Sequence, residues 1–502
     1  MKLNLFNMLI MGGLSVLPIC SPSADQFNFH HEGVLGTSLD LSIESDSIIT
    51  AGNAEAYALK EIERLSEIFS SYSRSSELSQ WLQTQNQPIV VSKELSTVFE
   101  MMGRWQVASH GAFSPATDEL AVLWKTGAKT GKAPDDNTIR NATKKASERH
   151  WKWDPEQASL TRLSDARLTL NSIAKGFIID LTGERLLQEF PASQSCMINI
   201  GGDLRLFGSR ETEVKISDPF DGAENVTIET IKISGNTAIA TSGNYRRGFQ
   251  IGDNHYSHIF DPRSGYPVDH IASSTVLAPS AADADALATI FSVLKVEQSL
   301  ALANQLPGVE CLLIEKDGSK RESEGWQAYR SPAMDSSVQF QVAQATQWSE
   351  QFEFIINFQL NRISGRRYRS PYVAVWITDA DKVPVKTLSL WIQKERWLPD
   401  LKSWYRDDKL RRLFDDTDLV ETISSATRPP GKYRLKWDGT DDLGLPTKPG
   451  NYFLQIEVTR EHGTYQIIRK ELTIQNEPFK IDFEENTELK SASIEYRPKK
   501  SI

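Results

Sequence analysis

The sequence predicts an α+β domain followed by a smaller, β-rich domain, and three observations support this division. Residues 33–330 alternate between helical and strand-like patterns of apolar residues. From Phe352 onward, β-rich runs separated by Pro, Gly and Asp turns replace the helical patterns, which is typical of a β-sandwich. Between the two regions, residues 334–348 are polar and rich in Gln and Ser, as expected for a linker.

A chain of 502 residues is also too long for one ordinary domain. Its hydrophobic content of 39% is sufficient for packed cores, so globular domains are expected. The predicted boundaries are a signal peptide at 1–24, a first domain at 25–332, a linker at 333–350, a second domain at 351–480 and a polar tail at 481–502.

The first 24 residues have the pattern of a secretory signal. A weakly positive start at Lys2 precedes a mostly apolar stretch from Leu3 to Leu17, which is too short to span a bilayer. Cys20 matches a lipid-attachment site only loosely because the bulky Ile19 precedes it, so soluble export is favoured over a lipid anchor. No other apolar stretch is long enough for a transmembrane segment. We therefore expect a periplasmic or otherwise exported protein.

The net charge and the cysteine content bear on nucleic-acid binding and on a possible disulfide bond. The net charge of −10 argues against a nucleic-acid partner, and no block of basic residues is present. If Cys20 leaves with the signal, Cys196 and Cys311 remain, each within an apolar, strand-like run. They could pair in an oxidising compartment, and the sequence leaves that question open.

Helical periodicity and short apolar runs define the elements of the first domain. A helix is predicted for Ala54–Phe69 and another for Leu95–Ser109, because apolar residues recur there every three to four positions. Short strands are predicted at Cys196–Ile200, Glu213–Ile216 and Val226–Ile233.

The second domain is predicted from runs of β-branched and aromatic residues. These runs are Phe352–Phe358, Tyr372–Ile377, Tyr433–Trp437 and Tyr452–Val458. Between the second and third of them, Trp391–Leu413 is basic, contains Trp and is expected to form a helix or loop.

The most informative segment is Ser280–Thr289, which has the pattern of a capped helix with oxygen ligands on one face. Ser280 followed by Asp283 is a capping-box pattern, and the intervening alanines favour a helix. Asp285 and Thr289, four residues apart, project from the same side. A carboxylate beside a hydroxyl suits Mg²⁺, which usually binds together with phosphates. The alternative is a capped surface helix with one isolated acid.

Two further segments combine glycine with a positive charge or a tight turn. Asn171–Phe177 follows an apolar stretch, and a helix beginning there would direct free amides and Lys175 toward a phosphate or a flavin carbonyl. The alternative is a solvated lysine in the first turn of an amphipathic helix. Gly201 and Gly202 end a predicted strand, where they permit either the close approach of a ligand or an ordinary hairpin.

Hydroxyl, arginine and histidine residues gather in two later segments. Ala240–Arg247 places hydroxyls and a glycine before two arginines, which suits an anion-binding site or simply an exposed turn. Tyr256–Pro267 contains His258, which is a candidate general base for a hydroxyl nucleophile near a phosphate. A single histidine of this kind is also often structural.

Taken in order, these segments resemble the ApbE family of FAD:protein FMN transferases. The matching segments are Gly36-Thr37, Tyr72 with Ser76–Leu78, Leu123-Trp124, Ile173–Gly176, Gly201–Asp203, Ala240–Gly243, His258–Pro262 and Ala284–Thr289. The resemblance implies a T-fold-like α+β domain that uses Mg²⁺ and the donor substrate FAD. It further implies attachment of FMN to a Thr or Ser hydroxyl of an exported acceptor protein, with release of AMP.

The resemblance also assigns roles to individual residues. Tyr72 matches a flavin-stacking tyrosine, and Lys175 matches a residue that contacts FAD. His258 matches the candidate base. The remaining matches to cofactor-binding positions are Leu35, Ala112, Phe113, Ser114, Thr169 and Phe260. The matches to metal-binding positions are Ser172, Asp285, Ala288 and Thr289.

Three positions depart from the family pattern. Leu35 stands where a Met is usual, and both Ser114 and Thr169 stand where an Asp is usual. The loss of two acids could weaken contacts to the cofactor or alter the metal site. Two alternatives to flavin transfer therefore remain open. The first is an FAD pyrophosphatase that releases free FMN, and the second is a non-catalytic periplasmic flavin-binding protein.

The second domain carries weaker resemblances. Residues 352–474 are similar to a periplasmic family of unknown function, DUF2271, and residues 437–452 are similar to the Ig-like domain of flagellar hook-capping proteins. Glu421–Thr427 is similar to the acceptor signature of ApbE substrates, Asp-x-x-Ser/Thr-Gly-Ala-Thr, with Glu in place of Asp and Ser425 in place of Gly. This similarity suggests Thr427 as an internal FMN acceptor. The alternative is a polar loop.

Overall fold

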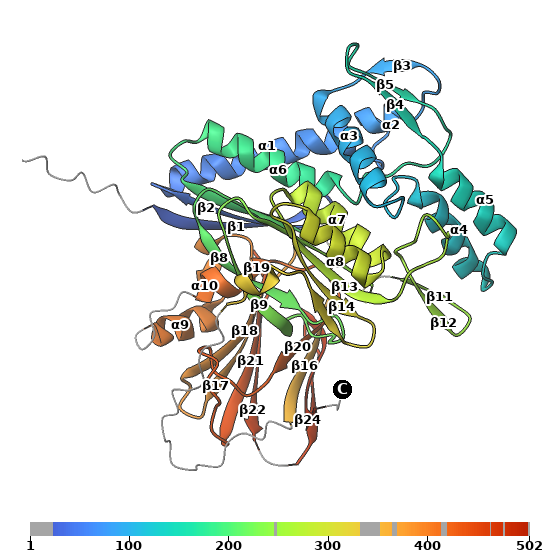
Figure 1. Cartoon of the computed structure of the whole chain (residues 1–502). Coiled ribbons are helices and arrows are strands. Elements are labelled where there is room, and N and C mark those ends of the chain that lie inside the picture. The colour runs from blue at the N-terminus through green and yellow to red at the C-terminus, as the bar shows by residue number, and fades with distance from the viewer. Residues whose placement is uncertain are drawn as a thin grey trace, which may run out of the picture.

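The computed structural model describes residues 24–244, 248–331, 352–363, 369–412, 419–461, 463–474 and 477–499, which form two packed domains (Figure 1). Several sequence predictions fall outside these residues. They are the signal peptide up to residue 23, Cys20, the linker at 333–350 and the arginine pair within Tyr245–Arg247.

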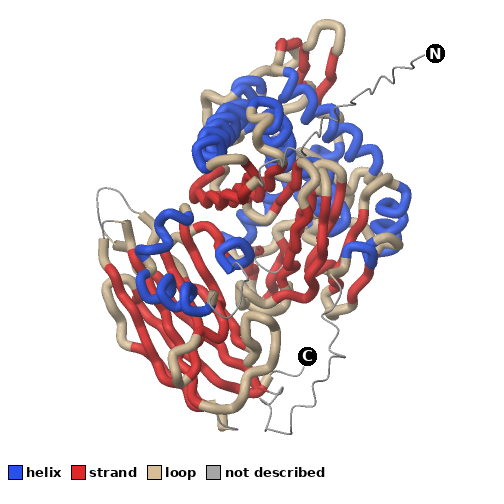
Figure 2. The backbone as a smooth tube through the Cα atoms, turned by 90° about the vertical axis from the view of Figure 1, so that its left-hand side faces the viewer, coloured by secondary structure: helices blue, strands red, loops and turns tan. Residues whose placement is uncertain are grey.

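The first domain is built on one antiparallel sheet of eight strands, in the order β1-β2-β6-β7-β10-β13-β14-β15. Helices α1, α6 and α7 lie along one face of this sheet (Figures 1 and 2). The strands are β1 (Asp25–Val34), β2 (Thr37–Ser45), β6 (Ser195–Ile200), β7 (Asp203–Phe207), β10 (Ala238–Gly243), β13 (Ile271–Ala278), β14 (Glu310–Glu315) and β15 (Lys320–Glu322). The three helices are α1 (Ile48–Phe69), α6 (Ala174–Glu189) and α7 (Ala281–Val293).

Shorter elements complete this domain. The further helices are α2 (Glu77–Trp81), α3 (Lys93–Ala108), α4 (Thr117–Thr130), α5 (Asp136–Ser147), α8 (Val296–Gln305) and the 3₁₀ turn η1 (Trp326–Tyr329). Three small sheets contain β3 (Pro88–Val90), β4 (Trp151–Asp154) and β5 (Ser159–Arg162), then β8 (Glu211–Ser217) with β9 (Thr227–Ser234), and β11 (Gly248–Ile251) with β12 (Asn254–Ser257).

The alternation of strand residues separates the two faces of the large sheet. On β2, Leu39, Leu41 and Ile43 are buried in the core beneath the helices, so Asp40 lies on the other face. Helix α1 contributes the predicted periodic side chains to the same core. It begins at Ile48, earlier than the predicted Ala54, because Ser47 accepts a hydrogen bond from Thr50 N and caps an exposed first turn that has no apolar periodicity.

The second domain is a sandwich of two sheets, ordered β20-β16-β24-β23 and β19-β18-β17-β21-β22, as the sequence predicts (Figure 1). Its strands are β16 (Phe352–Leu360), β17 (Tyr372–Asp379), β18 (Pro384–Ile392), β19 (Ser424–Ala426), β20 (Lys432–Trp437), β21 (Asn451–Thr459), β22 (Tyr465–Thr473), β23 (Phe479–Phe483) and β24 (Leu489–Pro498). The predicted insert forms the end of β18, then η2 (Glu395–Asp400) and α9 (Lys402–Arg411), and α10 (Leu419–Ile423) precedes β19.

The predicted polar tail at 481–502 is wrong, because most of it belongs to the sandwich. Strand β24 pairs along the whole of β16 and buries Leu489, Ala492, Ile494 and Tyr496 in the core between the sheets. Its apolar residues alternate with charged ones, so it has the pattern of a strand with one buried face.

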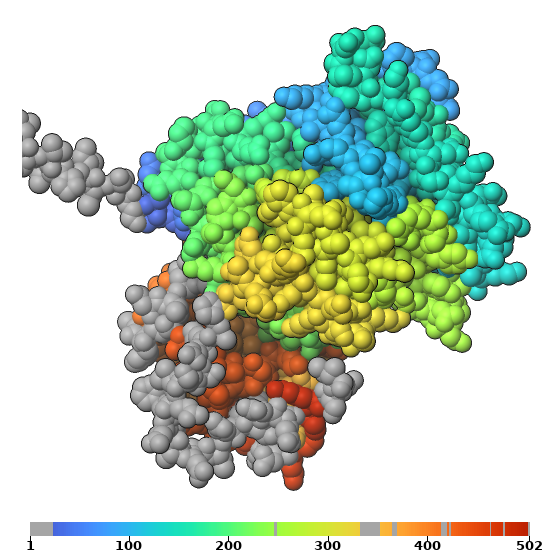
Figure 3. Space-filling view, viewed as in Figure 1, coloured from blue at the N-terminus to red at the C-terminus, as the bar shows by residue number. Residues whose placement is uncertain are grey.

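The second domain is docked against the edge of the large sheet. Backbone N–H of His30 donates to Gln393 O at 2.8 Å, and Lys394 reaches over β1 to Glu55 of α1, with Nζ 2.8 Å from Oε1. On the other face of the sheet, the imidazole of His30 lies between Asp40 Oδ1 at 2.7 Å and Ser424 Oγ at 3.1 Å. Figure 3 shows this second domain, in orange and red, beneath the first. The two domains therefore share an extensive polar interface.

Two remaining sequence predictions are settled by the fold. Cys196 and Cys311 are buried on β6 and β14 and are both free thiols, and burial raises the pKa of each to about 12. Within the described ranges, none of the helices is long and apolar enough to cross a membrane.

Candidate active site

The first turn of α7 is anchored at every backbone amide. Ser280 Oγ accepts from Asp283 N at 3.1 Å, as the sequence predicts, and donates to Asp283 Oδ2 at 2.8 Å. The carboxylate of Asp180, on α6, accepts from the amides of Ala281 and Ala282 at 2.8 and 3.0 Å. Asp283 also accepts from Trp105 Nε1 at 3.0 Å, so its charge belongs to the capping arrangement.

One turn further along α7, three charged side chains from three elements meet. Lys175, at the start of α6, places Nζ 2.6 Å from Oδ2 of Asp203, which begins β7. Asp285 lies close enough to both that its pKa responds to their charges. Burial raises the pKa of Asp285 well above its usual range, the negative charge of Asp203 raises it further, and Lys175 opposes both effects. Burial likewise raises the pKa of Asp203 against the opposing charge of Lys175.

Glycines allow these elements to approach one another. A Cβ on Gly176 would lie 2.2 Å from Ala281 O, so only glycine permits the contact between α6 and α7. At the β6–β7 turn, Gly201 and Gly202 have φ of +61° and +99°, which L side chains rarely adopt. A Cβ on Gly201 would also lie 2.7 Å from Thr37 Oγ1. The Gly-Thr, Ala-Lys-Gly and Gly-Gly-Asp segments of the sequence thus build one site.

The oxygen atoms around Asp285 that could serve as metal ligands are few, which fits a divalent cation held mainly by a substrate. Asp285 Oδ2 is buried and has no hydrogen-bond partner in the part of the chain that the structure describes. Thr289 follows one turn later, with its hydroxyl 3.5 Å from that of Ser242, and Ser172 is half-buried just before α6. Within the described residues, no group of three or more His, Cys, Asp or Glu could hold a metal alone. Mg²⁺ characteristically uses one or two carboxylates together with phosphates and water.

Ala288 is the exception among the four predicted metal ligands. Its side chain carries no donor atom and is 1% exposed. Its carbonyl already accepts from Ser292 Oγ at 2.9 Å. Ala288 could therefore contribute only its backbone carbonyl oxygen, whereas Asp285, Thr289 and Ser172 carry side-chain oxygens.

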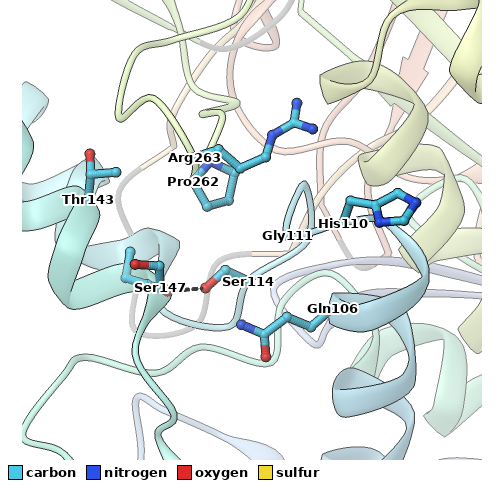
Figure 4. Close-up of a pocket in the computed structure, with 9 residues that line it drawn as sticks. Gln106, His110, Gly111, Ser114, Thr143, Ser147, Pro262 and Arg263 are labelled. Carbon is cyan, nitrogen blue, oxygen red and sulfur yellow. Dashed lines mark hydrogen bonds between the residues drawn. The ribbon is translucent and has the colours of Figure 1, made fainter.

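A cavity of about 340 Å³ lies at the C-terminal end of α3 (Figure 4). It is lined by Gln106, His110, Gly111, Ser114, Thr143, Ala146, Ser147, Pro262 and Arg263. Ser114 is the one predicted cofactor-binding residue in this lining. Its hydroxyl donates to Ala146 O at 2.8 Å and accepts from Ala116 N at 3.2 Å, so Ser114 stabilises the loop. The neighbouring Ala112 and Phe113 are buried in the main core.

The other predicted cofactor-binding residues lie on several different elements. Leu35 lies in the β1–β2 turn with a φ of +50°, and Tyr72 is 87% exposed after α1. Thr169 is half-buried, and its amide donates to Pro115 O. Phe260 is buried against Phe249 in a small separate core, so its side chain stabilises the loop that follows His258. His258 itself is half-buried directly after β12.

Comparison with known proteins agrees with this geometry. Residues 35–313, more than half of the chain, match the ApbE family, and residues 353–491 match a family described as predicted periplasmic protein (DUF2271). The chain belongs to the ApbE family. The segments of this sequence that resemble the family converge on Lys175, Asp203 and Asp285.

Individual relatives and structures extend the match over nearly whole proteins. An FAD:protein FMN transferase of Haemophilus influenzae is 30% identical over 305 residues, covering 56% of this chain and 85% of the relative. One from Vibrio cholerae is 29% identical over 320 residues, covering 62% and 94%. The crystal structure of the ApbE protein of Thermotoga maritima superposes with a TM-score of 0.55 at 25% identity, covering 61% of this chain and all of that one.

The carboxylates of two acidic residues, Asp203 and Asp180, are not assigned to the site from the sequence. Asp203 was interpreted only as part of a glycine turn, although a carboxylate directly after two glycines at a strand start was a usable signal. Asp180 was not singled out. It lies four residues after Gly176 and therefore on the same helix face, which is the signal that could have revealed it.

The predicted internal acceptor, Thr427, does not present its hydroxyl in this structure. Thr427 is 1% exposed, and its Oγ1 has no hydrogen-bond partner among the described residues. The neighbouring Ala426 amide donates to Asp40 Oδ1 at 3.2 Å, on the face of the sheet opposite the helices. Asp203 pairs with Ile200, whose side chain belongs to the core on the helix side. Transfer of FMN to Thr427 would therefore require its side chain to become exposed.

Proposed function

We propose that this chain transfers FMN from FAD to a Thr or Ser hydroxyl of an exported acceptor protein, in a Mg²⁺-dependent reaction that releases AMP. The observation that carries the proposal is the buried Asp285 carboxylate, with one oxygen unpartnered among the described residues and with Lys175 and Asp203 beside it. The names of the relatives, FAD:protein FMN transferase, supply the donor and the type of acceptor.

The raised pKa of Asp285 supports a cation at this position. Burial and the charge of Asp203 disfavour a bare carboxylate, so a bound cation would compensate a charge that the fold leaves poorly neutralised. Asp285, Thr289 and Ser172 would hold the metal, which supplies positive charge to the pyrophosphate when bound. The ammonium of Lys175 would contribute a second positive charge toward the pyrophosphate. Lys175 lies in the first turn of α6, where the helix dipole also favours a negatively charged ligand.

In the proposed reaction, residues of the chain orient FAD and accept the proton of the acceptor hydroxyl. An acceptor hydroxyl oxygen forms a bond to the phosphorus on the riboflavin side of FAD, and the bond from that phosphorus to the oxygen of AMP breaks. The hydroxyl proton passes to His258 as the candidate base, and the leaving phosphate carries the electron pair of the broken bond. Such phosphoryl transfer depends mainly on positioning and electrostatic stabilisation.

Features near both ends of the chain support an exported location for the proposed reaction. The start of the sequence has the pattern of a secretory signal, and the second domain matches a family described as predicted periplasmic. We therefore propose that the enzyme acts after export, on an acceptor carrying the family's Thr or Ser signature.

The test is in-gel flavin fluorescence after incubation of the full chain with FAD, Mg²⁺ and a peptide of the form Asp-x-x-Thr-Gly-Ala-Thr. A fluorescent, mass-shifted peptide and one AMP per FMN attached are expected. Asp285→Asn should abolish the product. Asp283→Asn is the matched control, because it lies on the same helix but its carboxylate only caps the first turn.

Two results would contradict the proposal. Release of free FMN and AMP without any adduct would identify a pyrophosphatase instead. Equal transfer by Asp285→Asn and the wild type would show that the buried carboxylate has no part in the reaction.

A further inference from the structure

The helix that carries Asp285 is held in place by a carboxylate that has no assigned role. Asp180 is 7% exposed on α6, and its two oxygens accept separately from Ala281 N at 2.8 Å and Ala282 N at 3.0 Å. The first amides of a helix have no partners within the helix, and a carboxylate there also interacts favourably with the helix dipole. Asp180 therefore satisfies two of the amides that α7 cannot satisfy itself.

The same face of α6 carries the other contacts to α7. Gly176 lies one turn before Asp180, and its missing side chain leaves room for the backbone of Ala281. Lys175 is the residue before Gly176, so the anchor and the ammonium of the site belong to one rigid helix. Any displacement of the first turn of α7 along α6 would therefore change the position of Asp285 relative to Lys175.

Asp180 is itself fixed from the sheet. Arg205 of β7 places NH1 2.7 Å from Asp180 Oδ1, and its side chain is 11% exposed. Asp203 begins the same strand two residues earlier. The anchor consequently joins α6, α7 and β7, which are the three elements that supply Lys175, Asp285 and Asp203.

We propose that Asp180 is a positioning residue for flavin transfer, whose carboxylate holds the first turn of α7 so that Asp285 and Thr289 are placed for the metal. This inference rests on the proposed function. Asp180 acts through α7, because both of its oxygens accept hydrogen bonds from the amides of that helix. Its replacement should lower metal affinity without abolishing the fold.

The experiment compares the full-length wild type with Asp180→Asn and with Glu184→Gln. Glu184 is the matched control, because it is the other acidic partner of Arg205 on α6, at 3.1 Å, but its side chain is 51% exposed and it has no recorded hydrogen bond to α7. Two quantities are measured. They are hydrogen–deuterium exchange of peptides covering residues 279–287 in EDTA, and the Kd for Mn²⁺ in the presence of saturating FAD.

Asp180→Asn should exchange the amides of 279–287 faster and bind Mn²⁺ about tenfold more weakly, the usual size of effect for groups that orient metal ligands. Glu184→Gln should behave as the wild type in both measurements. Asp180→Glu keeps two acceptor oxygens but adds a methylene in a buried position, so intermediate values are expected.

Wild-type exchange together with wild-type Mn²⁺ affinity in Asp180→Asn would overturn the proposal. If Asp180→Asn does not fold, the same two results in Asp180→Glu would overturn it. Should the wild type itself bind no Mn²⁺ and transfer no FMN, the proposed function fails. The exchange of 279–287 still decides whether Asp180 anchors α7, because that measurement needs neither metal nor activity.

Discussion

Both domains place a buried carboxylate at the start of a helix, yet only one of these helices carries an incompletely satisfied charge. In the first domain Asp180 accepts from two amides of α7. In the second, Glu457 of β21 accepts from Ser403 N and Trp404 N, at 2.9 and 2.8 Å, at the start of α9. The capping geometry is nearly the same in both places.

The acids further along the two helices differ. On α9, Asp407 accepts from Trp376 Nε1 at 3.1 Å, and Asp408 pairs with Arg411 at 2.9 Å. On α7, Asp285 keeps an oxygen without a donor in the described chain and faces a second carboxylate, Asp203. Capping is therefore common to the two helices, whereas a buried carboxylate oxygen without a donor among the described residues is found on α7 and not on α9.

The largest expected effect comes from removing the charge of Asp285. Asp285→Asn should raise the melting temperature of the metal-free protein at pH 7 while abolishing FMN transfer. The folded state disfavours the bare carboxylate, so a neutral side chain of the same shape should raise the free energy of unfolding. Scanning calorimetry in EDTA measures this, and a lower melting temperature would show that the carboxylate is structural.

Removing the positive charge from the same cluster should have the opposite effect on stability. Lys175→Met leaves Asp203 and Asp285 buried without their counter-charge, and the free energy of unfolding should fall by about 3 kcal/mol. The double variant Lys175→Met, Asp285→Asn should recover part of this loss. Urea unfolding of the four proteins checks it, and strictly additive changes would mean that the two side chains do not interact.

In the second domain, removal of the equivalent cap should affect stability alone. Glu457→Gln replaces one acceptor oxygen with a donor facing the backbone amides of α9, which should cost about 2 kcal/mol. Mn²⁺ affinity and FMN transfer should remain those of the wild type. A loss of metal affinity in this variant would show that the domain interface transmits changes to the site.

The last expected effect is a pH dependence in the sandwich. Burial raises the pKa of Asp442 from 3.8 to about 6. Between about pH 4 and pH 6, Asp442 keeps its proton in the folded state but releases it in the unfolded state. The free energy of unfolding should therefore fall as the pH rises from about 4 to 6, and it should not fall further above about pH 6 on account of this group. Asp442→Asn should remove this decline, which for a pKa change of this size is about 3 kcal/mol. A pH series of melting temperatures for both proteins provides the measurement.

Much of the fold was predictable because its signals are local. The cap at Ser280, the face shared by Asp285 and Thr289, and the turn at Gly201 follow from the spacing of neighbouring residues. The sandwich followed from alternating apolar runs, and the error over β24 arose because its four buried residues are interspersed with three charged residues and two serines.

The arrangement of the site was less predictable because it depends on contacts between distant segments. Lys175 and Asp203 lie 28 positions apart and meet only when α6 packs on the β6–β7 turn. The capping of α7 by Asp180 spans 101 positions. Burial of Thr427 is likewise a property of the docked domains, and a short acceptor-like motif carries no information about it.

The contact of residues 393–395 with β1 has a consequence for dissecting the protein. A chain ending after the first domain would leave the outer backbone groups of β1 exposed, including the His30 amide that now donates to Gln393 O. Such an open strand margin invites pairing with another molecule and hence self-association. We therefore expect the first domain to self-associate when the sandwich is removed, and the catalytic half is best studied with the sandwich attached.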